Sequence, residues 1–302
     1  MKVTIIGAGV LGTSLGLLLR RAGHDIAAIC SLNRRSAQEA ASHIGGCDVV
    51  GDPGLAAMGA DVVILAVPDR TIPSVAIEVA AGGALKRDAA VIHLAGGLPA
   101  GILSGVRAAG GYRGAMHPLQ SFASIDAAVR TLPDTFFFLE GDAPALEVMK
   151  ALVADLDGRP VTIDAGNKAL YHAAAAVASN FLVTLMDFAV TLLSKAGVSR
   201  ETALEALLPL IRGTVGNLED VGLPAALTGP IARGDVGTVR RHLRALQMLP
   251  SEMGKLYRHM ARKTIEVARR KGTLDQAGGE SLLDLLAEFE EPFAGPDEDL
   301  GV

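Results

Sequence analysis

Lys168 and His172 have the residue types and the spacing that suit a reaction at a carbonyl group. They lie four positions apart in a segment that we expect to be helical, so their side chains share one face, about 6 Å apart along the axis. Hydride transfer to a carbonyl carbon leaves negative charge on the oxygen, which needs a proton donor or a cation beside it. Lysine serves as either, and burial lowers a lysine pKa toward the working range. We therefore predict Lys168 and His172 as catalytic residues.

Both residues have a structural alternative. Lys168 could be an exposed lysine in the first turn of a helix, and His172 a core histidine whose hydrogen bonds are satisfied. Small side chains at Ala175 and Ser179 continue the shared face and leave room for a ligand. Asn180 lies about 18 Å from Lys168 along the helix and is rotated away from it, so one small carbonyl cannot contact both. Asn180 is predicted as a separate substrate contact.

Further polar residues lie in predicted loops and turns. His117 follows a predicted strand, and we predict it as a third catalytic residue, with Ser121 in the same loop as a substrate contact. Helix capping or loop packing is an equally good interpretation. Arg233 and Asp235 lie in a turn of the C-terminal half and are predicted substrate contacts, because an arginine can clamp a carboxylate through two hydrogen bonds. An ion pair of Arg233 with Asp235 or another acid is the alternative.

A glycine-rich turn near the N-terminus has the pattern of a phosphate-binding site. The sequence GAGVLG at residues 7–12 follows a β-type run and opens a helix that a second β-type run follows, which is the context that makes this pattern specific. Gly7 permits a tight turn, Gly9 lets the backbone approach a pyrophosphate, and Gly12 lets the helix pack on the strand. N–H groups at the helix N-terminus then face the anion. We predict that a dinucleotide contacts Gly7, Gly9, Val10, Leu11 and Gly12.

The end of the second predicted strand favours NADP(H) over NAD(H). NAD enzymes usually place a carboxylate about 20 residues after the glycines, on the ribose hydroxyls. Residues 31–36 read SLNRRS, so a 2′-phosphate would meet the Ser31 hydroxyl and the guanidiniums of Arg34 and Arg35. The alternative is that the arginines begin a solvated helix, and we expect one of the two to do only that. The cofactor is expected to contact, on its other side, Val67, Pro68 and Asp69.

The elements that must position these residues follow from the hydrophobic pattern. Short β-branched runs alternate with Ala- and Leu-rich stretches in the first half of the chain, which is typical of a doubly wound parallel sheet. We predict strands over residues 2–6, 25–30, 49–50, 61–67, 89–94, 114–116, 135–139 and 160–163, and helices over 168–196, 200–212, 235–246 and 251–270. The glycine turn and the loops that begin at Pro68 and His117 follow strand C-terminal ends, which is the edge of an open α/β sheet where ligands bind.

The predicted fold class is therefore α/β, with a doubly wound Rossmann domain followed by an all-helical domain. Because 302 residues exceed one ordinary core, we predict a cofactor domain over 1–165, a helical substrate and dimerisation domain over 166–288, and an acidic tail over 289–302. The apolar stretch 171–193 carries His172, Asn180 and Asp187 without a flanking basic cluster, so we interpret it as a buried helix and not a membrane span. Its apolar area exceeds what a monomer would cover, which predicts a homodimer through the helical domain.

Composition excludes several classes of partner. A net charge of −5, with arginines scattered among acids, makes nucleic acids and anionic membranes poor partners. The two cysteines, Cys30 and Cys47, have no ligand spacing, so we expect no metal site and no disulfide framework. The N-terminus runs directly into a strand and the glycine turn, which signal-peptide cleavage would destroy, so we expect a cytoplasmic protein.

These motifs together resemble those of two-domain proteins that join a Rossmann-like domain to a DUF2520 domain, distant relatives of ketopantoate reductase, pyrroline-5-carboxylate reductase and the β-hydroxyacid dehydrogenases. The resemblance spans roughly residues 1–285 and rests on GAGVLG, AVPD, MHPLQSF, YHAAAAVASNF and TGPIARGD. It implies a C-terminal domain like that of 6-phosphogluconate dehydrogenase and an NADPH-dependent reductase of a small 2-oxo acid, with ketopantoate the best single substrate. Relatives carry an Asn four residues after the catalytic Lys, and here His172 stands at that position.

Three alternative functions remain open from the sequence. An imine reductase of the pyrroline-5-carboxylate type needs less help from a proton donor, because its substrate can arrive as an iminium. An F420-linked NADP oxidoreductase shares the same cofactor turn. A dinucleotide-binding sensor would bind the cofactor and catalyse nothing.

Overall fold

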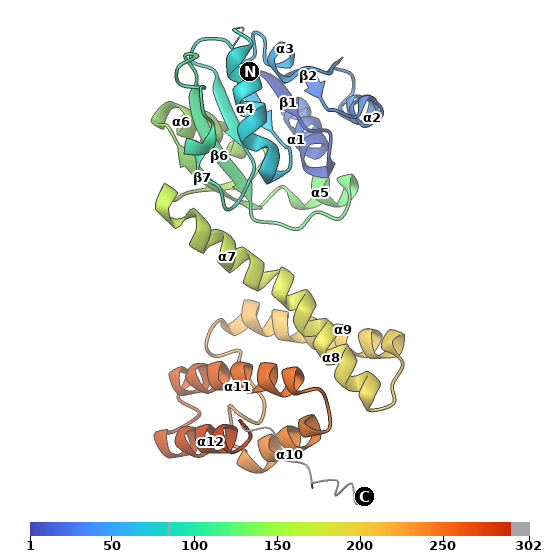
Figure 1. Ribbon diagram of the computed structural model, residues 1–302, viewed down its shortest axis with the longest axis vertical. Helices are drawn as coiled ribbons and strands as arrows, with labels where there is room; N and C mark the ends of the chain where they lie inside the picture. Colours follow the sequence, from blue (N-terminus) through green and yellow to red (C-terminus); the bar gives the residue numbers. More distant parts are fainter. Residues whose placement is uncertain (84, 291–302) are drawn as a thin grey trace, which may run out of the picture. The chain divides into compact units, whose positions relative to one another are not determined.

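The computed structural model describes residues 1–83 and 85–290 (Figure 1). The chain divides into two compact units, Met1–Leu182 and Val183–Val302. The last twelve residues of the predicted tail lie outside the described residues. The strands end near residue 162, close to the predicted boundary after residue 165, and the first compact unit extends a further helix to Leu182.

The first unit is built around one eight-stranded sheet with the order β3-β2-β1-β4-β5-β6-β7-β8. The strands are β1 (Lys2–Ile6), β2 (Asp25–Cys30), β3 (Asp48–Val50), β4 (Val62–Leu65), β5 (Ala90–His93), β6 (Tyr112–Pro118), β7 (Phe136–Gly141) and β8 (Arg159–Thr162). Each lies at a predicted position, and the predicted α/β class with a Rossmann-like domain is confirmed. The order reverses at β1 and β4, which is where an open sheet of this kind binds ligands.

One feature of the sheet departs from the prediction of parallel strands. Strand β7 runs antiparallel to β6, and β8 runs parallel to β7. Residues 119–135 are all described, and the only helix among them is α5 (Ile125–Thr131), which has seven residues and packs against α1 (Val10–Arg21). Such a short helix does not carry the chain back across the sheet, so β7 begins beside the end of β6, with Phe137 paired to Pro118.

Helices cover both faces of the sheet, which explains why the central strands β4 and β5 are buried along their whole length. They include α2 (Arg34–Ile44), α3 (Pro53–Ala56), α4 (Ile72–Ala81) and α6 (Ala143–Asp155), with 3₁₀ turns η1 (Asp69–Thr71), η2 (Ala100–Ile102) and η3 (Ala165–Asn167). Consecutive residues Ile5 and Ile6 belong to separate core clusters, one on each face. The strand ends at which the loops begin are therefore anchored between two packed cores.

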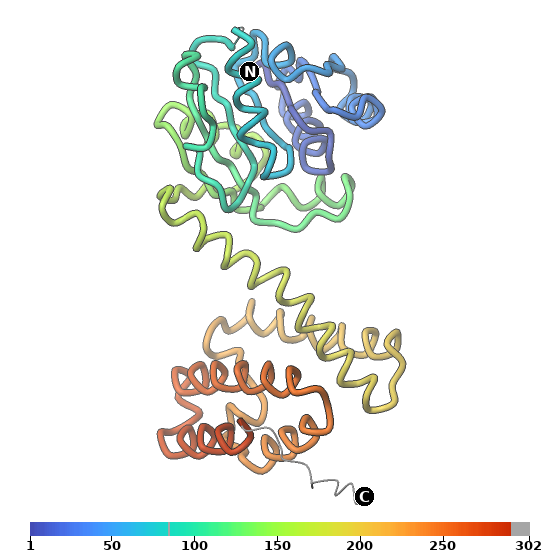
Figure 2. The backbone as a smooth tube through the Cα atoms, in the orientation of Figure 1, coloured from blue at the N-terminus to red at the C-terminus, as the bar shows by residue number. Residues whose placement is uncertain are grey.

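The helices that follow begin with α7 (Lys168–Ala178) and α8 (Asn180–Lys195), which meet at Ser179 within the predicted 168–196 helix. The second unit continues with α9 (Arg200–Val221), α10 (Val236–Gln247), α11 (Ser251–Lys271) and α12 (Gln276–Glu288). Helices α10, α11 and α12 pack on one another (Figure 2). Their shared core includes Val239, Ile265 and Leu282. The predicted start of α10 is confirmed, because the Asp235 side chain caps it by accepting from the Thr238 N–H at 2.9 Å.

The prediction that residues 171–193 form a buried helix is wrong for the single chain. Only 6% of the most apolar 18-residue window in Ala165–Lys195 is buried, and the described residues contain one helical stretch, this one, that could span a membrane by length and composition. Large apolar side chains such as Leu170, Val177, Phe181 and Val183 are more than half exposed. These side chains give the helical stretch a wide apolar face, and most of that face is exposed among the described residues.

Candidate functional site

The glycine turn between β1 and α1 is shaped by close contacts at two of its three glycines. Gly7 has φ of +120°, and a Cβ there would overlap the carbonyl oxygen of Ala66. A Cβ on Gly12 would overlap the Gly7 carbonyl oxygen. Gly9, the N-cap of α1, has no atom within 4 Å of its Cβ position and is exposed. The turn is therefore tightly packed at Gly7 and Gly12 and open to solvent at Gly9, as a backbone that binds pyrophosphate must be.

The helix N-terminus at this turn has free donors. Val10 and Leu11 begin α1 and pack partly against the core, and Gly9 offers no side-chain cap to the first turn of the helix. The N–H groups of that turn are the ordinary unsatisfied donors of a helix start. An anion in front of Gly9 would accept from them.

The end of β2 separates the two arginines into different roles. Arg35 forms an ion pair with Glu39 at 2.8 Å on the exposed face of α2. Arg34, the first residue of α2, is exposed and makes no ion pair with any residue that the structure describes. Ser31 accepts a hydrogen bond from the Asn33 N–H at 3.3 Å. Arg34 is therefore the better candidate for a 2′-phosphate, and Arg35 matches the expected solvated arginine.

Strand β4 brings a second loop against the glycine turn. Its C-terminal neighbour Ala66 is the residue that Gly7 and Gly12 pack against, and Val67, Pro68 and Asp69 follow directly. Asp69 is exposed, and its negative charge acts to raise the pKa of Lys168. The loop after β4 thus links the predicted cofactor turn to the predicted catalytic lysine.

Lys168 is almost fully buried at the start of α7, with 1% of its surface exposed. Its Nζ donates to the Ala95 carbonyl oxygen, in the loop after β5, at 3.3 Å. Burial lowers the pKa of Lys168, and the negative charges of Glu140 and Asp69 oppose that shift. The exposed-lysine alternative is wrong, because the side chain is buried. A buried ammonium with one carbonyl partner is costly, which is typical of a residue with a functional task.

Two imidazole rings, those of His117 and His172, lie beside the loop after β5. The His117 Nδ1 is 2.5 Å from the Tyr171 hydroxyl, and the rings of His117 and His172 are edge to face with centroids 5.9 Å apart. A Cβ on Gly96 would lie 2.5 Å from His172 Nδ1 and 3.0 Å from His117 Nε2, so both rings rest on this glycine. The structure therefore brings together Lys168, His172 and His117, as the sequence predicted, at the C-terminal edge of β5 and β6.

Three residues of this cluster were not predicted from the sequence. His93, the last residue of β5, is fully buried, and burial followed by the charge of Lys168 lowers its pKa to about 4. Tyr171 stacks on Phe138, and Glu140 accepts from the Ala100 N–H at 2.6 Å. A polar His93 at the end of an otherwise apolar strand was the one sequence signal present. Tyr171 and Glu140 carried none, because their contacts join segments far apart in the chain.

The four predicted substrate contacts belong to three separate segments of the chain. Ser121 is exposed after β6, and Asn180 begins α8. Arg233 is exposed in a turn of the second unit, and the Asp235 carboxylate caps α10. Arg233 and Asp235 form no ion pair within the described residues, although the arginine helps to lower the Asp235 pKa, after the Thr238 hydrogen bonds. Their roles toward a substrate stay predictions.

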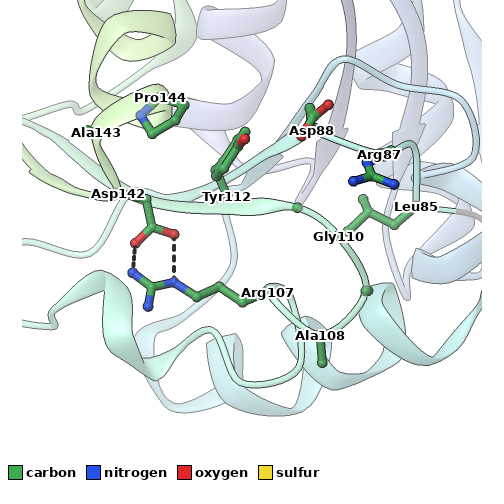
Figure 3. Close-up of a pocket in the computed structure, with 12 residues that line it drawn as sticks. Leu85, Arg87, Asp88, Arg107, Ala108, Gly110, Tyr112, Asp142, Ala143 and Pro144 are labelled. Atoms are coloured by element: carbon green, nitrogen blue, oxygen red, sulfur yellow. Dashed lines mark hydrogen bonds and ion pairs between the residues drawn. The ribbon is translucent and has the colours of Figure 1, made fainter.

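A surface depression of about 760 Å³ lies at the opposite edge of the sheet, beside the starts of β5 and β6 (Figure 3). Arg107 binds the Asp142 carboxylate there through Nε, at 3.1 Å, and through Nη2, and the Arg113 N–H donates to the same carboxylate at 2.9 Å. These contacts lower the Asp142 pKa to about 2, with the Arg107 hydrogen bond the main cause. The carboxylate ties three segments together and is not free to bind a ligand.

No cluster of three or more His, Cys, Asp or Glu side chains within residues 1–83 and 85–290 could hold a metal ion. The residues at the loop after β5 offer instead a cation, Lys168, and the ring nitrogens of His117 and His172. Lying at the same sheet edge as the glycine turn, these groups suit proton donation and charge stabilisation beside a bound dinucleotide.

Comparison with known proteins agrees with this arrangement. Residues 1–118 match the Rossmann-like domain model, and residues 135–264 match the domain of unknown function DUF2520. No curated protein matched the chain. Protein TM1727 from Thermotoga maritima is 28% identical with a TM-score of 0.73, over 89% of this chain and 99% of that one.

Two further solved structures carry cofactor names. A protein provisionally named an NADP oxidoreductase, from Bacteroides fragilis, is 26% identical with a TM-score of 0.71, over 88% of this chain and 98% of that one. Pyrroline carboxylate reductase from Plasmodium falciparum, solved with NADP bound, is 16% identical with a TM-score of 0.58, over 92% and 98%, and shares the fold alone. As its motifs predicted, the chain joins an N-terminal Rossmann-like domain to a DUF2520 domain.

Proposed function

We propose that the protein is an NADP(H)-dependent oxidoreductase that reduces a small carbonyl compound, with a 2-oxo acid as the substrate class. The observation that carries the proposal is the placement of buried Lys168 at the same sheet edge as the open glycine turn, with Asp69 linking the two. The Bacteroides fragilis neighbour, named for NADP, supports the cofactor. Ketopantoate is the first substrate to test, on the sequence resemblance.

The residues fit NADP(H). The turn at Gly9 and the start of α1 would hold the pyrophosphate, and Arg34, which has no ion-pair partner among the described residues, would hold the 2′-phosphate. The reduced nicotinamide, when bound, supplies the hydride. Lys168 stabilises the negative charge that develops on the substrate oxygen and has a lowered pKa suited to giving up a proton. His172, exposed beside it on α7, is placed to orient the substrate.

A substrate panel tests the proposal. Purified protein should oxidise NADPH with ketopantoate or another short 2-oxo acid, and more slowly with pyrroline-5-carboxylate. The Lys168→Met variant should lose the carbonyl activity. If only cyclic imines are reduced, and Lys168→Met retains that activity, the protein is an imine reductase, the activity that the Plasmodium falciparum fold neighbour favours.

An F420-linked enzyme and a non-catalytic sensor would each give a distinct outcome in the same assay. A change in deazaflavin absorbance on mixing NADPH with F420 would identify an F420-linked enzyme. Binding of NADPH without oxidation by any compound of the panel would identify a sensor.

We also propose a homodimer as the working assembly and the cytoplasm as its location. The exposed apolar side chains of α7, α8 and α9 support the dimer, because an aqueous monomer would leave this surface wet. Recovery of the native protein in the high-speed supernatant of lysed cells supports the location, and recovery in the membrane pellet contradicts it.

A further inference from the structure

We propose that Tyr171 is a positioning residue that fixes the tautomer of His117, so that His117 presents an N–H donor to the oxygen of the bound substrate. The inference rests on the proposed function and adds a role within the same site. In this proposal, Lys168 and His117 both stabilise the negative charge that develops on the substrate oxygen. Tyr171 contributes indirectly, by fixing the tautomer of His117.

The contact between Tyr171 and His117 is short and held from both sides. The Tyr171 hydroxyl lies 2.5 Å from His117 Nδ1. The Tyr171 ring stacks on Phe138, with centroids 4.1 Å apart and 27° between the planes. Phe138 is itself the antiparallel partner of His117 in the pairing of β6 with β7. One cross-strand pair therefore holds both rings, and the hydroxyl is aimed at Nδ1.

The protonation states decide which atom donates. Burial raises the pKa of Tyr171, so its hydroxyl keeps its proton, and in this proposal it donates that proton to His117 Nδ1. Burial, followed by the nearby Lys168, His172 and His93, lowers the His117 pKa to about 4, so its ring is neutral at neutral pH. A neutral imidazole carries one N–H. With Nδ1 accepting from Tyr171, that hydrogen is on Nε2.

The Nε2 atom faces the catalytic loop. It lies 3.0 Å from the Cβ position of Gly96, next to Ala95, whose carbonyl accepts from Lys168 Nζ. A neutral N–H and an ammonium therefore flank one short loop at the ligand-binding edge of the sheet. Fixed donors of this kind stabilise developing negative charge because they need no reorganisation during the reaction. The opposite tautomer would point a lone pair at the substrate oxygen.

The experiment combines imidazole nitrogen NMR with kinetics on the full chain. In ¹⁵N-histidine-labelled wild-type protein at neutral pH, His117 is expected to show a protonated Nε2 and an unprotonated Nδ1. In Tyr171→Phe both tautomers should appear, and kcat should fall about tenfold, with the Kd for NADPH unchanged. Phe138→Leu, which keeps both polar groups and frees the Tyr171 ring, should show a smaller change in the same direction.

A second tyrosine–histidine pair provides the matched control. Tyr257 and His242 make the same contact, at 2.8 Å between the hydroxyl and Nδ1, within the second unit. Tyr257→Phe should alter the His242 signals and leave kcat unchanged. A protonated Nδ1 on wild-type His117, or unchanged tautomer and kcat in Tyr171→Phe, overturns the inference. Failure of the wild type to bind NADPH overturns the proposed function instead, and the tautomer measurement still decides the role of Tyr171.

Discussion

At the level of single side chains, the site concentrates buried groups whose charged forms are disfavoured. Burial lowers the pKa values of Lys168, His93 and His117, and few compensating hydrogen bonds surround them. Groups held in this way reduce the stability of the fold, and they persist where a reaction needs them. Lys168 and the two histidines thus give stability a measurable dependence on mutation and on pH.

Lys168→Met should therefore raise stability while it removes activity. A lysine whose folded pKa is lowered reduces stability at neutral pH, where the unfolded chain is fully protonated, and the reduction disappears as the pH rises above the unfolded pKa. Methionine keeps the length without the charge. We expect a higher Tm than wild type at pH 7, a smaller difference near pH 10, and reductase activity lower by about 10²- to 10⁴-fold. A lower Tm at pH 7 would contradict this account of Lys168.

His93 and His117 should make the protein less stable in mild acid. Between about pH 6.5 and pH 4 the unfolded chain gains protons on these rings and the folded protein does not, so the free energy of unfolding falls as the pH falls. Denaturant titrations across this range should show the decline, and His117→Gln should flatten it. Replacement of the exposed His43 by Gln is the control and should leave the slope unchanged.

At the level of helices, strands and turns, Gly9 and Gly12 of the glycine turn have different roles. Gly12 is needed for packing, because a Cβ would overlap the Gly7 carbonyl, whereas Gly9 has open space around it. The fold therefore needs a glycine at Gly12, and the ligand needs one at Gly9. This separation allows cofactor binding to be removed without loss of the structure.

Gly9→Ala should fold and bind NADPH poorly, whereas Gly12→Ala should be strongly destabilised. Alanine is a weaker N-cap than glycine, so Gly9→Ala should lower the free energy of unfolding by at most about 1 kcal/mol. Its Kd for NADPH should rise, because the new methyl group points to where the pyrophosphate approaches. Denaturation curves and calorimetric titrations of both variants check this. Wild-type affinity in Gly9→Ala would show that the dinucleotide lies elsewhere.

The sequence predicted the strands better than it predicted their directions. All eight strands were located because short β-branched and aromatic runs stand out from Ala- and Leu-rich helices, and the central strands β4 and β5 are buried on both faces. The reversal at β7 depends on the short α5 and its contact with α1, which no local pattern records. Helix α9 continues through Pro209 to Val221, beyond the predicted end at residue 212.

The residues of the site also fall into two groups: those that local sequence patterns predict, and those that only long-range contacts bring into the site. Lys168, His172 and His117 were predicted from spacing and from their positions after strands. The contacts of Tyr171 with Phe138, and of Glu140 with Ala100, join segments that only the folded sheet brings together. Gly96 is a turn signal in the sequence, and the structure shows that its missing side chain makes room for two imidazoles.

At the scale of the whole molecule, the exposed apolar side chains of α7 and α8 are the basis for the dimer that we propose. Leu170, Phe181 and Val183 are exposed by 74%, 56% and 70%, in a stretch that would also pass as a membrane span by composition. We expect a dimer by light scattering in detergent-free buffer, and a monomer for Phe181→Glu. A wild-type monomer that binds lipid vesicles would contradict the dimer and favour a membrane surface.

We predict that the N-terminal turn and Arg34 bind NADP(H), and calorimetric titration of the wild-type protein with NADPH and NADH decides this. A charge-assisted hydrogen bond contributes about 1.5 to 3 kcal/mol, so NADPH should bind roughly 10- to 100-fold more tightly than NADH. Arg34→Ala should remove most of that preference, and Arg35→Ala should keep it. No binding heat with either nucleotide, or equal affinities in the wild type, would contradict the account.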